Sequence, residues 1–88
     1  MEREFYILSL KASANAQAGG VWWWFGPKNS GYTMFLENAG RYPESAVRTG
    51  QSYYNNGEST LAVPCEYAES LARRAVYQRS IKDMRDNA

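Results

Sequence analysis

The side chains of this sequence that could do chemistry are mainly aromatic. Three tryptophans and three tyrosines stand at Trp22, Trp23, Trp24, Tyr32, Tyr53 and Tyr54. Rings that face solvent could stack on a nucleobase or insert into a partner protein, since Trp and Tyr dominate both kinds of hot spot. The alternative is that the same rings fill the core, which is the commoner outcome for large aromatic residues.

A second candidate surface is basic. Five cations fall near the C-terminus of the chain, at Arg73, Arg74, Arg79, Lys82 and Arg85. They could contact phosphates or an acidic protein, but Glu69, Asp83 and Asp86 lie among them, which favours a solvated helix face. The two surfaces together give the predicted binding residues Trp23, Tyr32, Tyr53, Tyr54, Arg73 and Arg74.

Catalytic and metal chemistry is not indicated by the residue types. The chain has no histidine and one cysteine, Cys65, which has no basic neighbour to lower its pKa. The carboxylates stand at caps, turns and exposed helix faces, where nothing would raise their pKa. Gly19-Gly20 leads into an apolar run instead of following one, so no phosphate loop is indicated. We therefore predict a protein that is not an enzyme, with no catalytic residue, metal or cofactor.

Composition indicates one small globular domain, residues 1–88. The net charge is +1, with 44% hydrophobic and 22% charged residues, so the overall field does not favour nucleic acid. Glu2, Arg3 and Glu4 precede a short apolar run that is too charged and too short for a signal peptide or membrane span. We expect a cytoplasmic protein without membrane contact. Direct nucleic-acid contact and a homodimer both stay open.

The apolar runs predict four strands. Val21–Phe25 carries four consecutive aromatic residues between glycines, and Phe5–Leu10 is apolar on both faces, as a central strand would be. Tyr32–Leu36 and Thr60–Val63 are the other two. Gly26–Gly31 is a turn between adjacent antiparallel strands, and Ala12–Gly20 is a loop.

Two helices complete the predicted fold. Pro43–Thr49 reads as a short helix docked at a sheet edge through Ala46 and Val47, and Cys65–Tyr77 has helical spacing of its apolar residues. Tyr53–Glu58 has turn composition. The predicted fold class is α+β: a mainly antiparallel four-stranded sheet with one main C-terminal helix and one short helix.

Strand alternation predicts which tryptophans are exposed. Trp22 and Trp24 point to one face of the sheet, while Trp23 and Phe25 point to the other. Because one long helix covers only one face, we expect one pair to be core and the other to be open. The larger pair, Trp22 and Trp24, is assigned to the core, which leaves Trp23 as the exposed tryptophan.

Several short motifs resemble a group of small uncharacterised proteins encoded by phages and prophages of proteobacteria. They are FYILSLK at 5–11, GYT at 31–33, AGRY at 39–42, YYNNG at 53–57 and AVPCE at 62–66. The resemblance covers most of the chain up to about Val76. It assigns no active-site residues. It implies a phage context, in which small proteins without catalytic residues often inhibit a host defence component such as a CRISPR interference complex.

The expected function is therefore that of a phage-encoded, non-catalytic protein that inhibits a bacterial defence system, as an anti-CRISPR protein does, by binding a host protein complex. One alternative is a small-ligand or nucleotide-signal binding protein that sequesters its ligand in an aromatic pocket. Another is a nucleic-acid-binding accessory protein, whose binding would depend strongly on salt.

Overall fold

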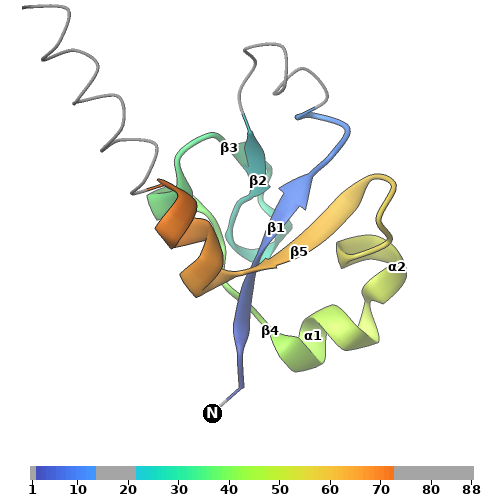
Figure 1. Ribbon diagram of the computed structural model, residues 1–88. Coiled ribbons are helices and arrows are strands. Elements are labelled where there is room, and N and C mark those ends of the chain that lie inside the picture. The colour runs from blue at the N-terminus through green and yellow to red at the C-terminus, as the bar shows by residue number, and fades with distance from the viewer. Residues whose placement is uncertain (1, 14–21, 73–88) are drawn as a thin grey trace, which may run out of the picture.

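The computed structural model describes residues 2–13 and 22–72 of the chain (Figure 1). The strands are β1 (Glu4–Ser9), β2 (Trp23–Phe25), β3 (Tyr32–Thr33), β4 (Tyr42–Pro43) and β5 (Thr60–Pro64). The helices are α1 (Glu44–Thr49), α2 (Gln51–Tyr54), the 3-10 turns η2 (Pro27–Asn29) and η3 (Leu36–Asn38), and a helical segment over 65–72. The predicted α+β class with an antiparallel sheet is confirmed, with five strands in the described part instead of four.

Strand β1 is the centre of the sheet, as its apolar sequence predicts. On one edge it pairs antiparallel with β5, from Phe5 opposite Pro64 to Ser9 opposite Thr60. Its other edge is shared by two strands, β4 at the start and β2 at the end (Figure 1). Strand β3 then pairs with β2, which gives the order β3-β2-β1-β4 with β5 on the far side of β1. Ile7 and Leu8, in the middle of β1, are therefore almost completely buried.

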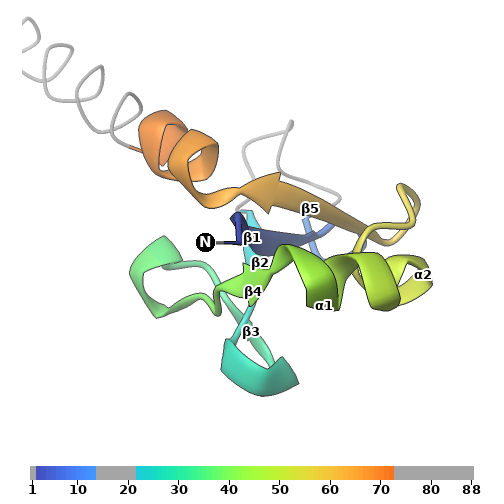
Figure 2. The same cartoon turned by 90° about the horizontal axis from the view of Figure 1, so that it is seen from below.

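Both faces of the sheet are covered by helices, and this corrects the prediction of an open face. On one face, Ile7 and Phe25 pack with Tyr42 and with Val47 of α1. On the other face, Tyr6 packs with Cys65 and Ala68 of the segment 65–72. Figure 2 shows α1 and α2 on one side of the sheet and the segment 65–72 on the other. Helix α1 therefore lies against a face through Val47, and not at an edge as predicted.

Helix α2 takes in Tyr53 and Tyr54, the first two residues of the turn predicted at Tyr53–Glu58. The chain leaves α1 at Gly50, whose N–H donates to the Ala46 carbonyl, and resumes a helical path at once, with the Tyr54 N–H donating to the Gly50 carbonyl at 2.8 Å. The Tyr54 ring packs against Tyr42 with centroids 5.1 Å apart. The packing of the Tyr54 ring on the core stabilises a helical turn that the local composition does not favour. The turn itself follows at 55–59, where the Asn56 side chain accepts from the Glu58 and Ser59 N–H groups.

The β2–β3 hairpin contains the predicted turn at Gly26–Gly31. Lys28 (φ 53°) and Asn29 (φ 59°) both adopt the left-handed region, in which only Gly and, to a lesser extent, Asn are common. Asn29 is held in place from two sides: its N–H donates to the Tyr42 hydroxyl and its side-chain amide donates to the Tyr54 hydroxyl, each at 3.1 Å. These bonds fasten the turn to β4 and α2.

Strand β3 ends sooner than the predicted Tyr32–Leu36. The Phe35 N–H donates to the Thr33 hydroxyl at 3.1 Å, a local turn that competes with strand pairing. Leu36 then begins η3. As a result Met34 and Phe35 leave the sheet instead of packing on it.

The outer edge of β5 is closed to further strand pairing. Ala62 and Thr60 point their N–H groups away from β1, and these donate to the Asn55 and Asn56 side-chain oxygens at 3.0 and 3.3 Å. The third outward position is Pro64, which has no N–H. Edge strands that expose N–H donors can pair with other chains and aggregate. Here the Asn55 and Asn56 side chains accept from the two outward N–H groups, and Pro64 has none, so β5 offers no free donor at these positions.

Candidate functional site

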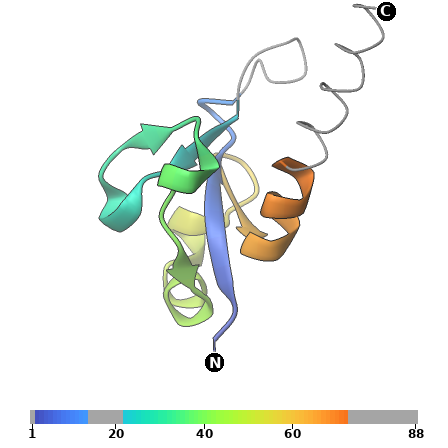
Figure 3. The same ribbon diagram turned by 90° about the vertical axis from the view of Figure 1, so that its left-hand side faces the viewer.

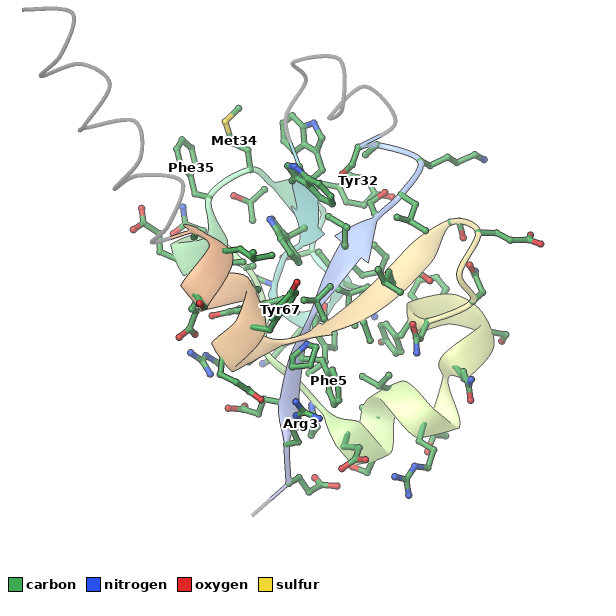
Figure 4. All side chains as sticks on the ribbon, in the orientation of Figure 1. Arg3, Phe5, Tyr32, Met34, Phe35 and Tyr67 are labelled. Atoms are coloured by element: carbon green, nitrogen blue, oxygen red, sulfur yellow. The ribbon has the colours of Figure 1, made fainter. Side chains whose placement is uncertain are left out.

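Three large apolar side chains lie exposed at the open end of the β2–β3 hairpin. Trp22 stands just before β2, and Met34 and Phe35 follow β3; their exposed fractions are 52%, 45% and 57%. Because β2 and β3 run antiparallel with Trp24 opposite Thr33, these residues lie at the same end of the hairpin. We call Trp22, Met34 and Phe35 the hairpin patch. In Figure 4, Met34 and Phe35 point away from the sheet.

The exposed tryptophan is Trp22, not Trp23. Trp23 is half-buried, and its N–H donates to the buried Ser13 hydroxyl at 2.8 Å. Trp24 is also half-buried, with its ring edge-on to Tyr6 at 6.0 Å. The prediction failed because α1 and α2 cover the face shared by Phe25 and Trp23, while Trp22 lies beyond the end of β2. The binding role assigned to Trp23 stays a prediction.

Two of the predicted binding residues, Tyr32 and Tyr53, come together in a small pocket. Its volume is about 170 Å³. Both tyrosines are more than half exposed. Their rings flank that of the buried Phe25, with centroids 5.6 and 5.8 Å from it. We call this cavity the tyrosine pocket.

The rim of the tyrosine pocket is polar. Lys11, Ser52 and Asn56 line it together with Ser9, Ser59 and Thr60. Among the described residues that line the cavity, Lys11 carries the only charge. The Thr60 hydroxyl donates to the Tyr53 carbonyl at 2.7 Å, which ties the turn to α2 and fixes the wall that Tyr53 forms.

Tyr54, another predicted site residue, does not line this pocket. Tyr54 lies behind Tyr53, with ring centroids 5.0 Å apart, and supports it from the core side. Arg73 and Arg74 lie outside the described residues. Glu69 pairs with Arg41.

A larger hollow of about 660 Å³ lies between η3 and the helical segment 65–72. Of its charged lining residues, Arg41 and Glu69 bind each other. The Arg41 guanidinium pairs with Glu69 and with Glu4 and lies over the Tyr6 ring, while the Tyr6 hydroxyl donates to Glu69 at 2.8 Å. Burial, together with this hydrogen bond, raises the pKa of Tyr6 to about 12. These contacts hold the segment 65–72 against β1. Because they also occupy the Arg41 guanidinium, the hollow is a weaker candidate for a ligand site.

Cys65 is a buried, structural residue. It begins the helical segment 65–72, is 3% exposed and packs against Tyr6 and Ala68. Burial raises the pKa of its thiol to about 11. A thiol in this state is a poor nucleophile at neutral pH, because the thiolate is the reactive form.

Comparison with known proteins gives no relationship from which a function could be transferred. No protein-family model matches the sequence, and neither a curated protein nor a solved structure is similar to it. Within residues 2–13 and 22–72, no group of three or more His, Cys, Asp or Glu side chains is placed to hold a metal ion. In the same ranges no helix is long and apolar enough to cross a membrane.

Sequence reasoning assigned Trp22 to the core and did not single out Met34, Phe35 or Lys11 as site residues. A usable signal existed for Met34 and Phe35, because Thr33 can end a strand by bonding to a nearby N–H, and residues after that point leave the sheet. No local signal marks Lys11, because the pocket it lines is built from segments distant in the sequence.

Proposed function

We propose that this chain is a phage-encoded, non-catalytic protein that acts in the bacterial cytoplasm and inhibits a host defence component by covering a protein surface on it. The observation that carries the proposal is the hairpin patch of Trp22, Met34 and Phe35. Large apolar side chains gathered on a surface mark interaction sites in proteins of this size.

The composition of the patch suits a protein partner. Aromatic residues and Met are enriched at protein interfaces, and a few exposed rings that fill partner pockets carry most of the binding energy. Within the patch, the Phe35 backbone is held by a hydrogen bond from its N–H to the Thr33 hydroxyl at 3.1 Å. A backbone ordered in this way loses less conformational entropy on binding.

The choice of a defence component as the target rests on the resemblance of the motifs at 5–11, 31–33, 39–42, 53–57 and 62–66 to small phage and prophage proteins. A CRISPR interference complex is the specific target we propose to test first. Expression of the protein in a bacterium with an active CRISPR system should restore plaque formation by a targeted phage.

Variants of the hairpin patch separate this function from folding. Trp22→Ala and Phe35→Ala should abolish the restoration of plaques while the melting temperature stays that of the unchanged protein. Tyr67→Ala is the matched control, because Tyr67 is equally exposed on the segment 65–72 but away from the hairpin (Figure 4). Equal activity of all three variants would contradict the proposal that the patch binds the target.

A further inference from the structure

The tyrosine pocket is built differently from the hairpin patch. It lies between the end of β1, the β2–β3 hairpin, α2 and the turn that leads into β5, so four separate parts of the chain form its walls. In Figure 3 the β2–β3 hairpin and the helical segment 65–72 lie on opposite sides of β1, and no residue of that segment lines the pocket. A ligand here would not need to touch the hairpin patch.

Size and shape favour one flat ring. A volume of about 170 Å³ holds a single ring system and little else, since pockets for whole drug-sized ligands start at roughly 300 Å³. Both tyrosine rings lie next to the Phe25 ring and are tilted to it by 60° and 63°. Aromatic side chains that leave a face open to solvent are the usual platforms on which nucleobases stack.

The polar groups favour an anionic substituent on that ring. Lys11 is exposed at one side of the pocket, and no carboxylate stands among its described lining residues. The hydroxyl of Ser52 and the side-chain amide of Asn56 also reach the rim, where they could bond to the edge of a base. The larger hollow differs in this respect, because its arginine is already bound to two glutamates.

We propose that the tyrosine pocket binds a nucleotide, with the base between Tyr32 and Tyr53 and the phosphate at Lys11. This site is separate from the protein-binding function proposed above and does not depend on it. A ring held by two tyrosines and a single cation gives modest affinity, so we expect dissociation constants in the micromolar to millimolar range.

The test is an NMR titration of the full chain with the four nucleoside monophosphates, taken up to millimolar concentration. The expected result is saturable shifts of the amide signals of Lys11, Tyr32, Tyr53 and Asn56. Tyr53→Leu keeps an apolar side chain over Phe25 but removes the aromatic face, and it should weaken binding about tenfold or more. Tyr67→Ala is the control and should bind as the unchanged protein does.

A second variant tests the phosphate. Lys11→Gln should lower the affinity for the nucleotide to that for the corresponding nucleoside and leave nucleoside binding unchanged. The proposal is overturned if no nucleotide gives saturable shifts, if the shifts map outside the pocket, or if Tyr53→Leu binds as well as Tyr67→Ala. Melting temperatures of the variants show that each is folded, so a loss of binding is not a loss of structure.

Discussion

At the scale of single residues, Gly40 has no room for a side chain. A Cβ atom there would lie 2.7 Å from the Pro27 Cα and 2.9 Å from the Gly26 carbonyl oxygen, both backbone atoms. The Gly40 N–H also donates to the Phe25 carbonyl at 2.9 Å, so the two segments cannot separate without losing a hydrogen bond. Because Gly40 has no side chain, the chain just before β4 can pass close to the backbone of the hairpin turn.

Gly40→Ala should therefore lower the free energy of unfolding by about 1–3 kcal/mol, as overpacking does. Urea denaturation measures the change. The matched control is Gly50→Ala, whose Cβ would approach the Tyr54 ring at 3.0 Å; a side chain can move by that amount, so the loss should be smaller. Equal losses for the two variants would show that the approach at Gly40 is not tight.

Cys65 and Tyr6 give the protein a pH dependence in the alkaline range. Burial raises the pKa of the Cys65 thiol to about 11 from an ordinary value of 9.0. Between these values the folded state holds its proton while the unfolded state releases it. The stabilising effect is complete below pH 9 and is lost as the pH rises toward 11.

We expect the free energy of unfolding to fall from pH 9 upward, by at most about 1.4 kcal/mol per pH unit for one group. Denaturant unfolding at successive pH values measures it. In Cys65→Ala the fall should start later, near pH 10, where Tyr6, with a pKa of about 12, begins to contribute. A flat profile up to pH 11 in the unchanged protein would contradict the burial of both groups.

At the scale of elements, the sequence pattern predicted the strands but not how the helices pack on them. Apolar runs suffice for β1, β2 and β5, because each run is rich in apolar residues and is bounded by glycine, proline or polar residues. Strand β4 has two residues and α2 has four, too few for any periodicity. Their positions are set by Tyr42 and Tyr54, whose hydroxyls bind Asn29 across the fold, and such contacts are not visible in a local sequence.

Because long-range contacts are not visible in a local sequence, the candidate site could be predicted only in part. Tyr32 and Tyr53 were predicted as binding residues from their type, and the fold brings them to one pocket. Strand alternation could not predict which tryptophan is exposed. Alternation assigns each side chain to a face of the sheet, whereas the packing of α1 and α2 determines whether that face is exposed. Trp22 is exposed because it lies beyond the paired part of β2, a boundary that the sequence does not mark.

The turn at 55–59 is an element whose stability depends on one side chain. The Asn56 side-chain oxygen accepts from the N–H groups of Glu58, Ser59 and Thr60 at 2.7, 2.8 and 3.3 Å. Asn56→Ala should cost about 0.5–1.5 kcal/mol of stability, because these N–H groups exchange their acceptor for water. Thermal unfolding measures the loss, and Asn38→Ala, at the exposed end of η3, is the control and should change stability by about 0.5 kcal/mol or less.

If Asn56→Ala also frees the outer edge of β5, the variant should self-associate more readily at high concentration, since Thr60 would then expose a donor on an edge strand. Light scattering would detect this. Unchanged stability together with unchanged association would contradict the role given to Asn56.

At the scale of the whole molecule, the fold separates two surfaces. The hairpin patch presents apolar side chains on a firm hairpin, and the tyrosine pocket lies between that hairpin and α2. The sheet between the helices supplies the rigid support for both. The central claim is that the hairpin patch is the surface that binds the target protein.

The most direct test is the affinity of Phe35→Ala for the proposed target, a CRISPR interference complex, measured beside Tyr67→Ala by calorimetric titration. We expect a loss of about 2 kcal/mol or more for Phe35→Ala, as for a hot-spot residue, with Tyr67→Ala and both melting temperatures unchanged. Equal affinities of the two variants would contradict this expectation.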